Sequence, residues 1–448
     1  MTTKIAPKNQ LVLANSTKSL RSFFNFSKNS GGKTTLLISF YCILFSILFM
    51  KRLLIIFVFI FTIATIFFVS KGLQFYKSIY KPSSVKIEEN KTAYNFLLLG
   101  YGGGKHEGTY LTDSMMLIHI DLKNKKTFLI SLPRDLWVKI PTKSGDDFHM
   151  KINALYQFDA DPDPSIRSNY PDINWVIVKK LGFSNLISLG IYQVTGLKVD
   201  NYTAVDFTSF KKAINAIGGV DINVKRAFED PQYPIDGKES ELCGKDDIFK
   251  QAEPFINPPY DISARAKLFA EKPEIEQFVK NATDSPELAF PCRYEKVVFK
   301  AGMTHIDGET ALKYVRSRHG IQDGSDFDRS ARQQQFIMAV KEKIISVDFI
   351  TKILPLMDTL KTDIKTDVSP TLIKKLVGEA PNAQKYSLSS LVLSDQNYLT
   401  DTVSTGGQYV LISKDETDNW QIVKQGINNF IAEITPTPIS SPTKPPNP

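Results

Sequence analysis

The stretch NFLLLGYGGGKHEGTYLTDSMMLIHIDLKNKKTFLISL (residues 95–132) contains three short apolar runs, at 95–100, 114–120 and 127–132. Glycines separate the first run from the second, and Asn-Lys-Lys separates the second from the third. Short apolar runs that are bounded by turn residues are typical of buried β-strands. The stretch therefore predicts the core of a sheet.

Helical patterns follow further along the chain. A helix is expected over 206–217, because its apolar residues recur at helical spacing, an Asp stands at the cap position and two glycines come next. A strand-like run follows directly at 220–224, and further helices are expected at 307–315 and 328–345. Strands that alternate with helices predict a layered α/β domain.

Charge is distributed unevenly along the 448 residues, which carry a net charge of +8. Twelve Lys or Arg precede the first carboxylate, Glu88, so the rest of the chain has 43 basic and 47 acidic residues. A duplex-binding domain concentrates positive charge on its folded part. Binding to nucleic acid is therefore disfavoured.

Two apolar runs near the amino end, 35–50 and 53–70, are separated only by Lys51 and Arg52. A hairpin of two spans would put these two cations on the side opposite the basic terminus, against the positive-inside tendency. We expect one uncleaved transmembrane helix at 53–70, with the amino end in the cytoplasm and the body outside the cell membrane.

The residues before and after the expected span have simple interpretations. Residues 1–52 form a basic cytoplasmic leader, although Met50 also resembles an ordinary protein start, which would make 1–49 an upstream extension. Residues 71–92 read as a polar stalk.

The body is expected over residues 93–433, and 372–433 read as a terminal α/β element. An insertion is expected at about 229–296, where prolines and mixed charges interrupt the pattern. The tail at 434–448 has six prolines and is expected to be disordered.

The body has two cysteines, Cys243 and Cys292, while Cys42 lies in the apolar leader. A pair of cysteines in an oxidising compartment can form a disulfide, and two unpaired thiols are the alternative.

Arginines stand at the points where expected strands and helices begin or end. Arg134 follows a buried strand, at the end of a sheet where open α/β sheets bind ligands. Arg316 and Arg318 lie two residues apart. On a helix their side chains would point to nearly opposite sides, so they act together only if the helix has ended and the chain is extended. Arg329 and Gln333 lie one turn apart at the start of a helix. The free N–H groups and the dipole of a helix favour anion binding at this end.

These positions could converge on one phosphate or pyrophosphate, or the arginines could make ordinary surface pairs with Asp135, Asp326 or Asp328. Asp113 could be a metal ligand or cap a turn. No HExxH, paired CxxC or G-x-S-x-G motif occurs in the sequence, which lowers the expectation of zinc-hydrolase or serine-nucleophile chemistry.

Seven segments together resemble the LytR-CpsA-Psr family, in that family's order, over about residues 93–345. They are NFLLLG, LTDSMMLIHID, SLPRDLWVKIP, KINALY, AINAIGGVDINV, AGMTHIDGETALKYVRSRHG and SDFDRSARQQQFI. The resemblance implies an extracytoplasmic three-layer α/β/α domain, with a mixed central sheet and an apolar pocket for a polyprenyl chain.

The resemblance also implies a magnesium-dependent phosphotransferase. Such enzymes take a glycopolymer, such as teichoic acid or capsule, from a polyprenyl-pyrophosphate carrier and attach it to a cell-wall sugar hydroxyl, typically on peptidoglycan. A pyrophosphohydrolase and a non-catalytic lipid- or glycan-binding wall protein are the alternatives.

The family's functional residues are assigned to positions in this chain by matching the motifs. The phosphate-binding arginines match Arg134, Arg316, Arg318 and Arg329, and the glutamine of the R-Q motif matches Gln333. The resemblance further suggests that Lys151 and Asp135 contact the substrate. Asp326 either orients an arginine or accepts the proton of the acceptor hydroxyl.

The chain departs from the family pattern at the expected metal site. Gly102 stands where members carry an Asp, and Leu111 stands where they often carry an Arg. Asp113 is retained as a metal ligand, and His106 or Glu107 in the loop at residues 104–108 could replace the missing carboxylate.

Overall fold

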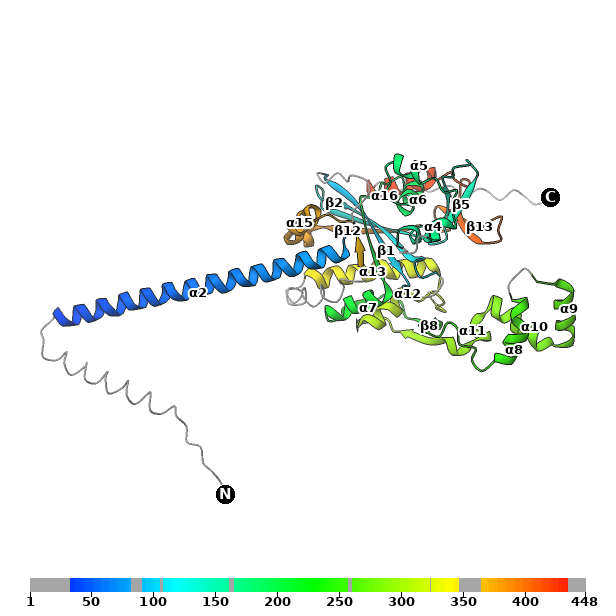
Figure 1. The fold of residues 1–448 in the computed structure, drawn as a ribbon, viewed down its shortest axis with the longest axis horizontal. Helices are drawn as coiled ribbons and strands as arrows, with labels where there is room; N and C mark the ends of the chain where they lie inside the picture. The colour runs from blue at the N-terminus through cyan, green and yellow to red at the C-terminus, as the bar shows by residue number, and fades with distance from the viewer. Residues whose placement is uncertain are drawn as a thin grey trace, which may run out of the picture. The chain divides into compact units, whose positions relative to one another are not determined.

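The computed structural model (Figure 1) describes residues 33–81, 91–104, 108–160, 165–256, 260–322, 324–345 and 364–433. The chain divides into two compact units, residues 1–74 and 75–448. The expected tail at 434–448 and the first 32 residues of the expected leader lie outside the described residues.

The first unit contains most of one long helix, α2 (Lys33–Ile79), which continues without a break through Lys51 and Arg52. The described helix therefore has no hairpin turn at these two residues. Its segment Leu54–Ile79 is long and apolar enough to cross a membrane. The helix continues beyond residue 70 and includes the first part of the expected stalk.

A six-stranded mixed sheet forms the centre of the second unit, in the order β11-β6-β1-β2-β3-β12. The pairs β1–β6 and β3–β12 are parallel, and the other neighbours are antiparallel. Its strands are β1 (Ala93–Tyr101), β2 (Thr112–Asp121), β3 (Lys126–Leu132), β6 (Asn201–Asp206), β11 (Ile364–Thr366) and β12 (Ser387–Val392). The three strands expected within residues 95–132 are confirmed as β1, β2 and β3.

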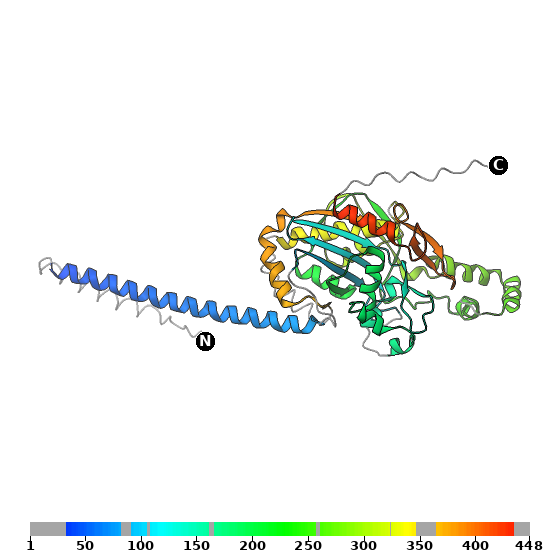
Figure 2. The ribbon, with the colours of Figure 1, turned by 90° about the horizontal axis from the view of Figure 1, so that it is seen from above.

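Helices cover both faces of this sheet, which confirms the expected three-layer α/β/α arrangement (Figures 1 and 2). One face carries α6 (Leu186–Thr195) and α16 (Gln421–Ile431). The other carries α7 (Phe207–Ala216), α12 (Gly308–Arg316) and α13 (Asp326–Ile345).

The alternating side chains of β1 divide between the two faces. Leu97 and Leu99 are fully buried in the core beneath α6 and α16. Burial of each leucine side chain contributes roughly 2 kcal/mol to the stability of the fold. Leu98 and Gly100 point the other way and line a cavity.

Local sequence signals explain where the helices next to that cavity begin. The carboxylate of Asp206 caps α7 by accepting a hydrogen bond from the Ser209 amide at 2.6 Å, and Asp307 caps α12 in the same way. Gly218 and Gly219 follow α7 with φ of 81° and 76°, a backbone conformation that favours glycine. The chain then enters β7 (Val220–Val224), as expected.

Smaller elements surround this framework. The further strands β4 (Trp137–Ile140), β5 (Phe148–Lys151), β10 (Gly302–Ile306), β13 (Leu399–Val403) and β14 (Tyr409–Ser413) pair as β4–β5, β7–β10 and β13–β14. Short helices are η1 (Ile152–Ala154), α3 (Gln157–Ala160), α4 (Ser165–Ser168), α5 (Trp175–Lys180), α15 (Pro370–Glu379) and η4 (Ala380–Lys385).

The expected insertion consists of a strand pair and a set of helices. The pair is β8 (Phe228–Pro234) and β9 (Tyr294–Phe299), and residues 235–293 between them form what we call the helical arm. A disulfide joins Cys243 to Cys292 near the two ends of the arm. Its helices are α8 (Asp246–Ala252), η2 (Glu253–Phe255), α9 (Ile262–Glu271), α10 (Pro273–Asp284), α11 (Pro286–Ala289) and η3 (Pro291–Arg293).

The arm has a small apolar core of its own, separate from the other two apolar clusters of the second unit. That core contains Ala252, Ile275, Phe278, Val279, Ala289 and Phe290.

The last residues of α2 belong to the second unit and are fixed to the edge strand β11. The Lys81 amide donates to the Thr366 carbonyl at 2.8 Å, and the Tyr76 hydroxyl donates to the Val368 carbonyl at 3.3 Å. Ile79 is buried. The expected stalk is therefore ordered against the body over residues 75–81.

The partly buried carboxyl group of Asp159 makes the stability of the fold depend on pH. Burial raises the pKa of Asp159 to about 7, although nearby Arg167 and Lys81 oppose the shift. Oδ1 lies 3.2 Å from Arg167, whereas Oδ2 has no hydrogen-bond partner. Between about pH 4 and pH 7 the folded state holds a proton that the unfolded state has lost.

We therefore predict that the free energy of unfolding falls as the pH rises from 4.5 to 7.5. In Asp159→Asn this fall should be smaller by about 2–4 kcal/mol. Thermal unfolding of the detergent-solubilised full chain across this pH range measures the effect. The matched control is Asp395→Asn at an exposed position. Equal pH dependence in all three proteins would contradict the assignment.

Candidate active site

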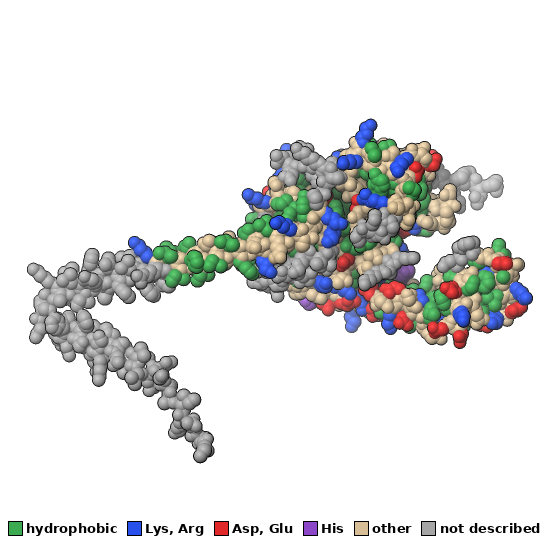
Figure 3. Space-filling model, in the orientation of Figure 1, with side chains coloured by type: hydrophobic (Ala, Val, Ile, Leu, Met, Phe, Trp, Pro, Cys, Tyr) green, Lys and Arg blue, Asp and Glu red, His purple; other side chains and the backbone are tan. Residues whose placement is uncertain are grey.

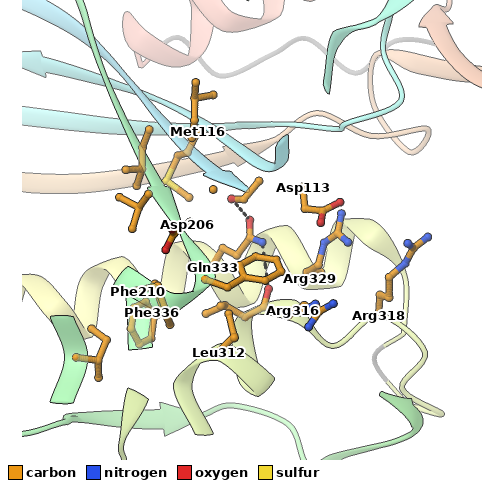
Figure 4. Close-up of a pocket in the computed structure, with 18 of the residues that line it drawn as sticks. Asp113, Met116, Asp206, Phe210, Leu312, Arg316, Arg318, Arg329, Gln333 and Phe336 are labelled. Carbon is orange, nitrogen blue, oxygen red and sulfur yellow. Dashed lines mark hydrogen bonds between the residues drawn. The ribbon is translucent and has the colours of Figure 1, made fainter. Parts of the chain in front are cut away.

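A cavity of about 520 Å³ lies between the central sheet and the helices α7, α12 and α13 (Figure 4). Arginines and a carboxylate gather at one end, and apolar side chains line the rest. The residues at the polar end include Asp113, Ser114, Arg134, Asp230, Arg316, Arg318, His319, Arg329 and Gln333. The apolar residues include Leu98, Met116, Val205, Phe210, Ile214, Leu312, Phe336, Ile337, Val340 and Ile364.

Helix α13 shows the change of character along the cavity. Arg329 and Gln333 line the cavity from the first turns of this helix, whereas Phe336, Ile337 and Val340 line it from later turns. Eleven residues of α-helix span about 16 Å. The cavity therefore fits a long amphipathic molecule with an anionic head.

Arg134 reaches the polar end from the loop after β3. Its Nη1 donates to Oδ1 of Asp113 at 2.8 Å, so the cation and the carboxylate form a pair on the cavity wall. Lys151 contacts Oδ1 of Asp135 at 2.6 Å, and neither of these two residues is among those that line the cavity. This ion pair supports the segment that carries Arg134, and the substrate contact expected for the two residues stays a prediction.

Arg316 and Arg318 both reach the cavity because α12 ends between them. Ser317 has φ −52° and ψ 134°, which ends the helix and turns the next residue to the same side. The buried carboxylate of Asp230 holds this turn. It accepts hydrogen bonds from the Ser317 hydroxyl and from the amides of Arg318 and His319, the latter two at 3.1 and 3.2 Å.

These hydrogen bonds also determine the charge of Asp230. Burial alone would raise the pKa of its carboxyl group, but the hydrogen bonds from Ser317, Gln232, His319 and Arg318 together outweigh burial and lower the pKa. A stable carboxylate is therefore fixed directly behind the two arginines.

Arg316 is held more tightly than a surface arginine. Its Nη1 donates to Oδ1 of Asp236 at 2.6 Å, at the base of the helical arm. The guanidinium also lies over the rings of Phe207 and Tyr233, at 4.7 and 5.5 Å from their centroids. Stacking and a charged partner fix the plane of its donors.

Arg329 and Gln333 complete the polar end. Arg329 is buried in the first turn of α13. Gln333 accepts from the Ser114 hydroxyl at 2.8 Å and donates to the Val315 carbonyl at 3.1 Å, so it links β2 to α12 (Figure 4).

The structure thus brings together six of the residues singled out from the sequence: Asp113, Arg134, Arg316, Arg318, Arg329 and Gln333. His106 and Glu107 lie outside the described residues, as does the side chain of Asp326. Sequence reasoning missed Asp230 and Asp236. Both fall within the segment interpreted as an insertion, and Asp230 acts on a turn 87 residues later in the chain.

The site accommodates a divalent cation with few protein ligands. Magnesium is commonly bound through one or two carboxylates together with substrate phosphates and water. Asp113 provides one carboxylate beside the arginines. Asp206 also lines the cavity, but its Oδ1 is used to cap α7. The residues present therefore fit a magnesium ion that would take most of its ligands from phosphate and water.

The fold and the cavity define a class: a three-layer α/β/α protein with a cavity that is cationic at one end and apolar along the rest. The model of the LytR_cpsA_psr family matches residues 63–425, which is most of the chain. This chain belongs to the LytR-CpsA-Psr family.

Several curated proteins are similar to it in sequence. Biofilm regulatory protein A of Streptococcus mutans is 24% identical over 72% of this chain and 61% of its own length. The polyisoprenyl-teichoic acid–peptidoglycan teichoic acid transferase TagV of Bacillus subtilis is 23% identical over 64% and 52%. TagU of Oceanobacillus iheyensis, which is also named as a polyisoprenyl-teichoic acid–peptidoglycan teichoic acid transferase, is 23% identical over 78% of each chain.

The chain thus matches about half to two thirds of the length of the first two relatives. Among solved structures, that of B. subtilis TagV has a TM-score of 0.46 and 20% identity, and it covers 78% of this chain and 100% of that one.

We predict that Asp230→Asn weakens anion binding at the arginines at least tenfold, because an amide cannot accept from all the donors that now converge on the carboxylate. The substitution should also lower the free energy of unfolding by about 1–3 kcal/mol.

Calorimetric titration with inorganic pyrophosphate and urea unfolding of the full chain measure these two effects. The exposed Asp221, which pairs with His305, provides the control variant Asp221→Asn. Unchanged pyrophosphate affinity in Asp230→Asn would refute the assigned role.

Proposed function

We propose that this chain is a membrane-anchored phosphotransferase. It moves a glycopolymer from a polyprenyl-pyrophosphate carrier to a sugar hydroxyl of the cell wall, typically on peptidoglycan, and releases polyprenyl phosphate. The observation that carries the proposal is one cavity with clustered arginines at one end and apolar walls along the other. The names of the relatives TagV and TagU, which describe teichoic acid transfer to peptidoglycan, support the same assignment.

The arginines provide the chemistry that a pyrophosphate requires. Guanidinium groups bind phosphate oxygens through two parallel hydrogen bonds and stabilise the negative charge that builds up on a leaving phosphate. Arg134, Arg318 and Arg329 line the polar end for this purpose. Arg316, held by Asp236 and two rings, fixes the shape of the same wall.

The proposed reaction is a single displacement at phosphorus. The acceptor hydroxyl attacks the phosphorus attached to the glycan, the bond to the bridging oxygen breaks, and polyprenyl phosphate leaves. The hydroxyl loses a proton, for which Asp326, the first residue of α13, is our candidate acceptor. A bound magnesium ion would neutralise charge on the phosphate oxygens, and Asp113 would hold it.

The anchor and the cysteines support the proposed location of the body. A single span with the amino end in the cytoplasm leaves the body outside the cell membrane. The disulfide between Cys243 and Cys292 is consistent with an oxidising compartment. The wall acceptor would be available on that side.

The proposal is tested by incubating the full chain in nanodiscs with a polyprenyl-pyrophosphate-linked glycan, magnesium and a peptidoglycan acceptor. Both lipid monophosphate and glycan joined to the acceptor are measured. Joined glycan with an equal amount of lipid monophosphate is the expected result. Lipid monophosphate alone would indicate hydrolysis, and bound lipid without either product would indicate a binding protein.

We predict that Arg318→Ala lowers the transfer rate by about 100- to 1,000-fold, the usual cost of removing a group that stabilises the transition state. Arg318→Lys should recover only part of the rate, because an ammonium group lacks the guanidinium fork. Single-turnover kinetics in the nanodisc assay give the rates.

The control for this series is Arg265→Ala, in the helical arm, where the guanidinium lies over Tyr260. It should transfer at the wild-type rate. A loss in the control equal to that in Arg318→Ala would show that the effect is not local to the cavity.

We predict that Asp113→Asn raises the magnesium concentration needed for half-maximal transfer at least tenfold, because a carboxylate ligand is lost. His106→Ala should raise this concentration as well if the loop at residues 105–107 replaces the acid missing at Gly102. Magnesium titrations of the transfer rate distinguish these cases. An unchanged requirement in His106→Ala would eliminate that compensation.

A further inference from the structure

A group of lysines borders the apolar end of the cavity. We define the lysine face as residues 75–81, 341–345 and 364–378, which include the end of α2, the end of α13, β11 and most of α15. These stretches contain seven lysines and two acids, Glu342 and Asp367, of which Asp367 is buried. The lysines are Lys77, Lys81, Lys341, Lys343, Lys365, Lys374 and Lys375.

The position of these lysines follows directly from the lining of the cavity. Val340 lines the apolar end from α13, and Lys341 is the next residue. Ile364 lines the same cavity from β11, and Lys365 is the next residue. The arginine end of the cavity lies at the other end of α13, so the backbones of Lys341 and Lys365 lie near the apolar end.

The face also combines features that suit a lipid surface. The pKa of Lys81 is lowered, mainly by burial and secondly by the positive charge of Lys365. The two ammonium groups therefore repel one another. An anionic surface would relieve this repulsion. Ile344 and Ile373 are partly exposed among the lysines, at 46% and 37%.

This face and the expected membrane span are close to each other along the chain. The apolar run expected to span the bilayer ends at residue 70, and six residues later Tyr76 is bonded to Val368. Six residues of helix extend only about 9 Å. The Lys81–Thr366 hydrogen bond then fixes the chain to β11 itself.

The helical arm has the opposite charge. Residues 235–293 contain twelve acids and eight basic residues, so the arm is net negative. In Figure 3, acidic side chains are prominent over β8 and the arm, and basic side chains are prominent near the end of α2. An anionic membrane would therefore attract the lysine face and repel the arm.

We propose that the lysine face lies on the anionic phospholipid surface, so that the apolar end of the cavity opens to the bilayer and the arginine end points away from it. The statement that the apolar end opens to the bilayer rests on the proposed function, in which the substrate is linked to a lipid. In this arrangement the tail of the carrier passes from the bilayer into the cavity without crossing water. The helical arm is then directed towards the cell wall.

The test is hydrogen–deuterium exchange of the full chain in nanodiscs of phosphatidylcholine, with and without 30% phosphatidylglycerol. We expect amides of β11 and α15 to exchange at least about threefold more slowly in the anionic discs, and 0.5 M NaCl to remove the difference by screening. The variant Lys77→Glu/Lys374→Glu should lose this protection.

The matched control is Lys250→Glu/Lys267→Glu, which reverses two exposed charges on the arm and should keep the protection. Equal exchange of β11 and α15 in both kinds of disc, or protection of the arm, would overturn the proposal. Exchange is read without any transfer reaction. Docking without transfer would therefore count against the proposed function alone, and transfer without docking would count against this inference alone.

Discussion

The carboxylate of Asp230 is the constraint on which the polar end of the cavity depends. By accepting from Ser317 and from the amides of Arg318 and His319, it stabilises the turn that ends α12. A helix that continued through this point would send two arginines spaced two apart to nearly opposite sides. A single buried acid therefore converts a local sequence repeat, R-S-R, into one cationic wall.

The rest of the cavity is organised along α13. The same helix presents Arg329 and Gln333 first and Phe336, Ile337 and Val340 later, so the polar and apolar ends cannot change their separation. The parallel strands β1 and β6 form the opposite wall through Leu98 and Val205. A ligand with a charged head and a long apolar chain matches this rigid spacing, whereas a small phosphate ester would leave the apolar end unfilled.

The sequence predicted the framework well, because periodicity and capping are local signals. The three first strands, the helix capped by Asp206 and the ends of β7 all lie where local patterns indicated. The arginines of the site could be found because they stand at the ends of those elements. Asp230 and Asp236 could not, because their partners are 80 or more residues away and only the tertiary fold brings them together. The pairing of Lys151 with Asp135 could not be predicted either, because only the three-dimensional structure brings these two side chains together.

The base of the helical arm has one further consequence. The Ile235 amide donates to the Arg293 carbonyl at 2.8 Å, and the Cys243–Cys292 disulfide closes the chain just beyond this point. The arm thus leaves and rejoins the body at neighbouring positions and keeps its own apolar core. Such a segment behaves as an interchangeable unit: the part beyond Asp236 can be lengthened, shortened or replaced during evolution, while Asp236 stays bonded to Arg316.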